Sequence, residues 1–159
     1  MQKLYIDRRA SDNKYFHRDF HIAFDRGLMY LGTKFGGDSV DEYLKMFALE
    51  FYAPLISDAN NRCFSALREH IESIYEIEEA PEAVSFVETD EVLQVFVTAC
   101  PAVKYMRNAG HEPSEWYEKS TSVVYKTIAE AAGFDFEMIS YVEETGAAQY
   151  RFTKGGASI

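Results

Sequence analysis

Residues 83–101 read AVSFVETDEVLQVFVTACP, and this stretch decides the class of fold. Valine and phenylalanine dominate two runs within it, 83–88 and 92–99, and such runs are typical of β-strands. The polar residues between the runs, 89–91, predict a short turn. We therefore expect the two runs to pair as an antiparallel hairpin.

A second hairpin is expected near the end of the chain, where residues 135–143 and 147–153 flank a turn at 144–146. Apolar side chains recur at helical spacing elsewhere. The expected helices span 12–34, 39 to about 54, 60–78, 102–108 and 115–132. The resulting order, ααα-ββ-αα-ββ, predicts an α+β fold in which helices cover one face of an antiparallel sheet of two hairpins.

Two local signals place the ends of the second expected helix. Ser39 and Glu42 have the spacing of a capping box, which places the start of this helix at Ser39. Pro54 marks a break or kink near its end, because proline lacks the backbone N–H that a helix needs.

Length and composition predict one domain over residues 1–159, with 47% hydrophobic residues available for its core. The net charge is −10, and residues 37–100 carry three Lys/Arg against fourteen Asp/Glu. This acidic stretch would repel phosphates, so we expect no nucleic-acid partner. No apolar run reaches the length of about 20 residues that spans a membrane. The polar segment 1–12 has no signal-peptide core, so the expected location is cytoplasmic.

Cys100 is the first candidate for chemistry. It precedes Pro101, and proline is favoured at the first position of a helix. The thiol is therefore expected near the helix N-cap, where the positive end of the helix can lower a thiol pKa. A thiolate there could be a nucleophile, a metal ligand or an anchor for a ligand. The alternative is a compact, partly buried residue at a strand-to-helix corner.

His17 and His21 form the second candidate, because residues at positions i and i+4 share one face of a helix. Asp25 continues the same side one turn later. The two imidazoles could bind a divalent metal, with Cys100 as a third ligand. They could also act as a general base and its partner. Solvated or hydrogen-bonded histidines at the edge of the core are the alternative.

Aromatic residues supply the candidate ligand-binding positions, since the chain has twelve Phe, eleven Tyr and one Trp. Pockets for small organic ligands are apolar and aromatic, but an ordinary core has the same composition. Arg151 could bind a carboxylate through two hydrogen bonds, or it could lie on the solvent face of the sheet. The candidate positions are Phe20, Phe24, Tyr52, Tyr105, Trp116 and Arg151.

Two further features have simple structural interpretations. Cys63 and His70 lie two turns apart in the third expected helix, and we expect them to pack in the core. The acidic run 69–91 lacks the spacing of a calcium-binding loop. We interpret it as a solvated helix face followed by a turn.

Three segments together resemble a known family: YFHRDFH at 15–21, TACPAVKYMRNAG at 98–110 and ETGAAQYRF at 144–152. Over residues 15–153 the chain resembles the L-2-amino-thiazoline-4-carboxylic acid hydrolase-like proteins. That family is in turn similar to the hydrocarbon-binding four-vinyl-reductase domains. The resemblance implies an α+β ligand-binding fold, a small organic ligand, ring-opening hydrolysis of a cyclic amide or amidine, and a dimer.

The resemblance carries Cys100 and the histidine pair over to this chain as the site residues. Relatives often place a second cysteine in the last hairpin, where this chain has Ala147 and Ala148. This difference puts a two-cysteine metal or redox site in doubt.

Three functions remain open from the sequence. The first is a domain that binds a small organic molecule without turnover. The second is a hydrolase that uses Cys100 together with His17 or His21. The third is an interaction subunit that dimerises through its first two helices, and it is compatible with either of the others.

Overall fold

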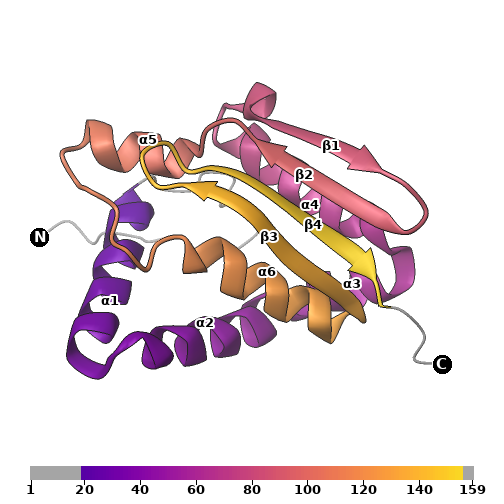
Figure 1. The fold of residues 1–159 in the computed structure, drawn as a ribbon, viewed down its shortest axis with the longest axis horizontal. Coiled ribbons are helices and arrows are strands. Elements are labelled where there is room, and N and C mark those ends of the chain that lie inside the picture. Colours follow the sequence, from indigo (N-terminus) through magenta and orange to yellow (C-terminus); the bar gives the residue numbers. More distant parts are fainter. Residues whose placement is uncertain (1–18, 156–159) are drawn as a thin grey trace, which may run out of the picture.

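The computed structural model describes residues 19–155, which form six α-helices, a short 3-10 helix and one four-stranded sheet (Figure 1). The elements are α1 (Asp19–Phe35), α2 (Gly37–Phe51), α3 (Ala53–Arg62), α4 (Phe64–Ile77), η1 (Pro81–Ala83), β1 (Val84–Glu88), β2 (Val92–Val97), α5 (Pro101–Asn108), α6 (Lys119–Ala131), β3 (Phe134–Val142) and β4 (Ala147–Lys154). The predicted α+β class is confirmed. Within this described part, no helix is both long and apolar enough to cross a membrane.

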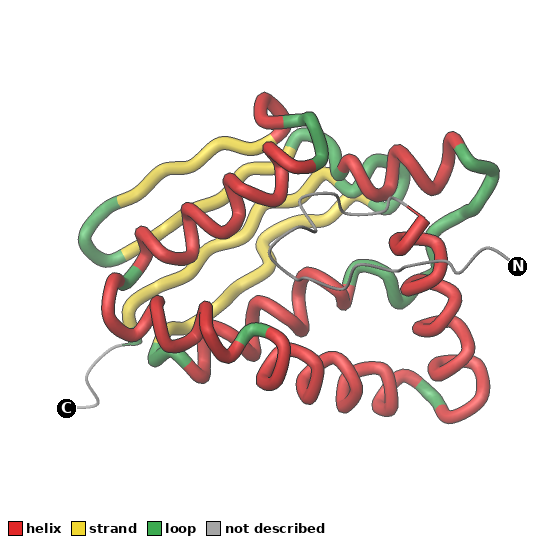
Figure 2. Tube along the Cα trace, turned by 180° about the vertical axis from the view of Figure 1, so that it is seen from behind, coloured by secondary structure: helices red, strands yellow, loops and turns green. Residues whose placement is uncertain are grey.

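The two predicted hairpins form one antiparallel sheet with the strand order β1-β2-β4-β3. The second strand of each hairpin lies at the centre, where Leu93 pairs with Phe152 and Val95 pairs with Tyr150. These four side chains are buried, because they face the helices that Figure 2 shows lying over the sheet. The opposite face carries polar residues such as Arg151. One side of the sheet therefore supplies the wall of the interior.

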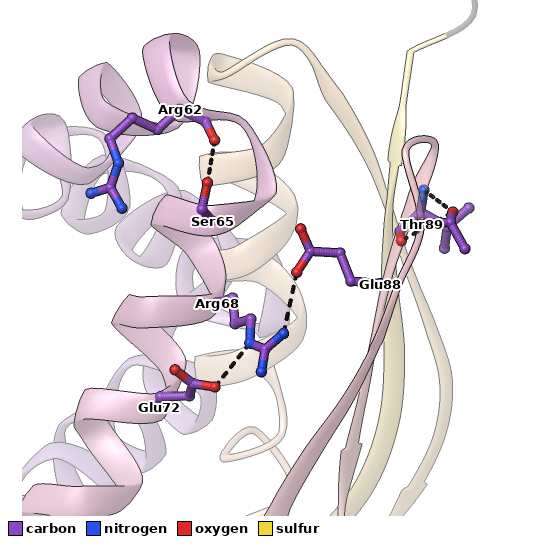
Figure 3. Close-up of polar contacts among 7 residues, drawn as sticks. Arg62, Ser65, Arg68, Glu72, Glu88 and Thr89 are labelled. Atoms are coloured by element: carbon purple, nitrogen blue, oxygen red, sulfur yellow. Dashed lines mark hydrogen bonds and ion pairs between the residues drawn. The ribbon is translucent and has the colours of Figure 1, made fainter.

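Helix α4 is attached to the edge strand β1 by Arg68 (Figure 3). Its guanidinium donates from Nε to Glu72 Oε1 at 2.9 Å and from Nη1 to Glu88 Oε2 at 3.5 Å. It also lies over the Phe86 ring, 5.2 Å from the ring centre. In the adjacent turn, Thr89 Oγ1 accepts a hydrogen bond from the N–H of Val92 at 3.1 Å. These contacts support the hairpin that the sequence predicted.

The prediction of one continuous helix over residues 60–78 is wrong, because the helix is interrupted at Cys63, between the end of α3 and the start of α4. Cys63 has a φ of 55°, which interrupts the helical path, and its side chain is exposed. The expectation that Cys63 packs in the core is therefore also wrong. His70 lies half-buried on α4, with its ring edge-on to Tyr52 at 5.4 Å.

The predicted boundaries around the second helix also need correction. Helix α2 begins at Gly37, with Gly36 as its N-cap, so Ser39 lies inside the first turn. Ser39 Oγ donates to Gly36 O at 2.6 Å, and the predicted capping box does not form. Pro54 lies in the first turn of α3, where proline is tolerated because that N–H has no helical partner.

Helix α1 is held against the segment before α6 by a close backbone contact. Gly32 is buried on α1, and a Cβ atom at this position would lie 2.4 Å from the Trp116 ring. Only glycine allows this approach, so the indole rests directly on the helix backbone. Trp116 was predicted to bind a ligand, but its ring packs against the backbone of α1 instead.

Candidate functional site

A cavity of about 170 Å³ lies between the buried face of the sheet and helices α1, α4 and α6. Tyrosine side chains dominate its lining, and we call it the tyrosine cavity. Its six tyrosines are Tyr52, Tyr75, Tyr117, Tyr125, Tyr141 and Tyr150. Cys100, His21 and Glu78 also line it. The fold therefore brings two of the predicted catalytic residues, Cys100 and His21, to one cavity.

The tyrosine rings form packed walls rather than isolated contacts. Tyr125 of α6 stacks on Tyr150 of β4 with ring centres 5.6 Å apart. Burial raises the pKa of all six phenols above the ordinary value. The hydroxyl groups therefore stay neutral near pH 7 and can both donate and accept hydrogen bonds.

Cys100 lies at the corner between β2 and α5, as the Cys-Pro pattern predicted. It is the N-cap of α5, and Pro101 occupies the first turn. The N–H of Cys100 donates to Thr145 O at 2.9 Å, which ties the corner to the β3–β4 turn. In that turn, Gly146 packs so closely that a Cβ atom would lie 2.4 Å from Cys100 Cβ. The thiol is thus fixed at the wall of the cavity.

The expected lowering of the Cys100 pKa is wrong. Burial raises the pKa of this thiol, and it outweighs the backbone N–H groups of Val103 and Ala102, whose hydrogen bonds lower it. The charge of Glu78 raises the pKa further. Sequence reasoning recognised the favourable helix terminus but could not see the depth of burial, which disfavours the charged thiolate. Cys100 is therefore a neutral thiol unless a base removes its proton.

His21 and Glu78 form an imidazole–carboxylate pair in the cavity wall. His21 Nε2 lies 2.7 Å from Glu78 Oε1, and the two side chains are only 13% and 7% exposed. His21 comes from α1, and Glu78 is the C-cap of α4. Glu78 was not among the predicted site residues, because the acidic run 69–91 has the composition of a solvated surface. No local signal separates Glu78 from its exposed neighbour Glu76, since the contact that distinguishes Glu78 is with His21, 57 positions away in the sequence.

The proposed metal ligands are only partly described. His17 lies outside residues 19–155, so the structure does not place it. His21 and Cys100 line the same cavity. Among residues 19–155, no group of three His, Cys, Asp or Glu side chains has an arrangement that could hold a metal ion. A site that combines His17, His21 and Cys100 stays a prediction.

The predicted ligand-binding residues separate into two groups. Tyr52 lines the tyrosine cavity. Tyr105 lines an adjacent cavity of about 390 Å³, which shares Glu78, Cys100 and Pro101 with the first. The remaining four, Phe20, Phe24, Trp116 and Arg151, are not among the residues that line either cavity.

Packing and ion pairing explain where these other residues lie. Phe20 and Phe24 stack on one side of α1 with ring centres 5.5 Å apart, and Phe24 continues to Phe47 of α2 at 6.1 Å. Arg151 lies on the open face of the sheet and pairs with Glu137 on the neighbouring strand at 2.5 Å. The predicted carboxylate contact of Arg151 is thus made within the protein, on the side of the sheet away from the cavity.

Asp25 anchors the helix that carries His21. Its side chain is fully buried, and its carboxylate lies 2.7 Å from His111 Nε2. Ser114 donates to it twice, from the backbone N–H at 3.0 Å and from Oγ at 2.6 Å. Asp25 therefore joins α1 to the segment between α5 and α6. The sequence analysis placed it beside the histidine pair on α1 and missed His111, because the two residues are 86 positions apart.

A comparison with protein-family models finds no match to this chain, and a comparison with curated proteins finds none either. These comparisons do not bear on the resemblance to the thiazoline hydrolase-like family.

Proposed function

We propose that this domain binds a small organic molecule, of the size of one ring, in the tyrosine cavity. The observation that carries the proposal is the lining: six neutral phenols surround one volume, with a thiol and an imidazole–carboxylate pair in the same wall. Ligand sites typically combine aromatic walls with a few polar groups that fix orientation. An apolar cavity of about 150 Å³ is large enough to hold benzene, so about 170 Å³ suits a single ring.

The polar groups of the lining favour a ring that contains or carries heteroatoms. Besides the phenols, the hydroxyls of Ser120 and Thr121 line the cavity. A purely hydrocarbon ligand would offer these hydroxyls no hydrogen bond, and an unpaired buried polar group is costly. The resemblance to a family with a small cyclic substrate agrees with this choice.

A cavity-filling variant tests the proposal. Ser120→Phe places a ring in the cavity, and we expect it to weaken the binding of one-ring probes such as benzyl alcohol more than about tenfold. Ser122→Phe is the matched control, because Ser122 follows two positions later on α6 and lies in a surface hollow beside Lys126 and Glu130. Isothermal titration calorimetry measures both. Equal affinity in the two variants would show that the ligand does not occupy this cavity.

A hydrolase is the second candidate, and one arrangement favours it. The Cys100 thiol lines the same cavity as His21, whose ring is oriented by Glu78. In this candidate, His21 takes the proton from the Cys100 thiol, and the thiolate attacks the carbon of a cyclic amide or amidine. The ring C–N bond then breaks as His21 returns the proton to the departing nitrogen. A water molecule that gives its proton to His21 finally hydrolyses the covalent intermediate and releases the Cys100 thiol. Cys100→Ser and His21→Ala would then lower turnover by about a hundredfold or more. Mass spectrometry of the ring-opened product measures this, and unchanged turnover in both variants rules the candidate out.

We also propose that two copies associate through α1 and α2. Of the twelve large hydrophobic side chains that are exposed in residues 19–155, eight lie on these two helices. They include Tyr30 and Phe35 on α1 and Met46 and Leu49 on α2. Exposed apolar patches often mark protein interfaces. Sedimentation at micromolar concentration is expected to give the mass of two chains, and the mass of one chain at all concentrations would refute the dimer.

A further inference from the structure

The described side chains that line the tyrosine cavity supply a permanent charge of one sign only, which is negative. Among the described residues 19–155, Glu78 is the only acidic residue in its lining, and no lysine or arginine lines it. The Glu78 side chain is 7% exposed and is held by one contact to His21 through Oε1. A carboxylate offers about four acceptor positions, so this contact leaves capacity for a donor on a ligand. Lys104 lines only the adjacent cavity, where Glu79 and Glu82 accompany it.

The aromatic rings that line the cavity add a second attraction for a positively charged ligand. The face of an aromatic ring carries partial negative charge, and a cation within about 6 Å of the ring centre is attracted to it. Cages of several aromatic rings are a known means of recognising ammonium groups. Here six tyrosine rings and one carboxylate line a single cavity. A neutral guest would use only part of this arrangement.

The negative charge of Glu78 affects the pKa values of other groups that line the cavity. Burial is the main reason why the pKa values of Tyr75 and Tyr117 are raised, and the charge of Glu78 raises both further. Cys100 shows the same two causes. A charge that opposes ionisation of these groups will attract a cation placed among them.

In the part of the chain that the structure describes, the positive groups near the cavity already have partners. At the N-terminus of α5, the backbone N–H groups of Ala102 and Val103 act on the Cys100 thiol, because they lower its pKa. His21, which carries positive charge only when protonated, contacts the Glu78 carboxylate. Among residues 19–155, an anionic guest would therefore meet phenol hydroxyls but no lysine or arginine in the lining of this cavity.

We infer that the tyrosine cavity takes a small organic cation, with an ammonium group directed at Glu78 and enclosed by the tyrosine rings. This inference rests on the proposed function, because it specifies the ligand of the same cavity. The net charge of the chain, −10, would also raise the local concentration of such a ligand.

A series of three probes with one ring and different charge tests the inference on the intact protein. The probes are benzylamine, which is cationic near pH 7, benzyl alcohol, which is neutral, and benzoate, which is anionic. Isothermal titration calorimetry at low and moderate salt gives their affinities. We expect benzylamine to bind at least about tenfold more tightly than benzyl alcohol, and benzoate to bind most weakly.

The variant Glu78→Gln removes the charge and keeps the shape. We expect it to bring the affinity ratio of benzylamine to benzyl alcohol close to one, while benzyl alcohol still binds. Glu76→Gln is the matched control, because Glu76 lies on the same helix with an exposed side chain. It should leave the ratio of the unmodified protein unchanged.

The outcomes separate this inference from the proposed function. Equal affinities for benzylamine and benzyl alcohol in the unmodified protein, or tightest binding of benzoate, overturn the organic cation and leave the cavity as a ligand site. An unchanged ratio in Glu78→Gln overturns the role of Glu78. If none of the three probes binds, both the inference and a one-ring ligand fail.

Discussion

Replacing Asp25 with alanine is expected to lower the free energy of unfolding by about 3–5 kcal/mol, because three donors around a buried carboxylate lose their acceptor together. The carboxylate is fully buried and receives the hydrogen bonds of His111 and Ser114. Without it, the imidazole and two donors of Ser114 lose their partner inside the protein. Each unsatisfied buried group costs about 1–3 kcal/mol, which supports the same range.

The measurement is urea unfolding monitored by circular dichroism, with Asp58→Ala as the control. Asp58 pairs with Arg62 one turn away, but both side chains are more than 40% exposed, at 44% and 43%. Exposed pairs of this type contribute about 0.3–0.5 kcal/mol. Asp25→Ala is therefore expected to cost several times more than Asp58→Ala. If the two variants lose equal stability, Asp25 is not the anchor of α1.

This anchor also affects the site. His21 lies one turn before Asp25 on α1, so the contact of Asp25 with the segment before α6 fixes the position of His21 against Glu78. An enzyme or binding protein built on this cavity would depend on α1 being held. Asp25 does not line the cavity, but it stabilises the helix that carries His21 to it.

Local sequence signals predicted the parts of the fold that depend on nearest neighbours. The hairpin at 83–99 and the turn into α5 at Cys100 follow from residue types that are adjacent in the chain. The break at Cys63 was missed, because a positive φ at a cysteine has no signal in the residue type. The class of fold could be predicted, while the boundaries of α2, α3 and α4 could not.

The candidate site could be predicted only in part, for a physical reason. Cys100 and His21 were named because of their local pattern, but Glu78 and the ring of tyrosines come together only when four helices and the sheet pack. The direction of the Cys100 pKa shift was wrong for the same reason. A helix terminus is visible in sequence, whereas burial is a property of the folded chain and here has the larger effect.

Gly146→Ala is expected to lower the free energy of unfolding by about 2–5 kcal/mol, from two separate costs. Gly146 has a φ of 66°, and a non-glycine residue in this left-handed region costs about 1–2 kcal/mol. The new Cβ would also lie 2.4 Å from Cys100 Cβ and 2.8 Å from Val103 Cγ2. Relieving such overpacking typically costs about 1–3 kcal/mol more.

Gly133→Ala separates the two costs. Gly133 has a φ of 82°, but no atom lies within 4 Å of the Cβ position. This control should lose only the backbone cost of about 1–2 kcal/mol in the same urea unfolding experiment. Because Gly146 and Cys100 both line the tyrosine cavity, Gly146→Ala should in addition weaken the binding of one-ring probes, which Gly133→Ala should not. Equal losses of stability and unchanged binding in both variants would mean that the β3–β4 turn does not pack against the Cys100 corner, and that the wall of the cavity is not closed there.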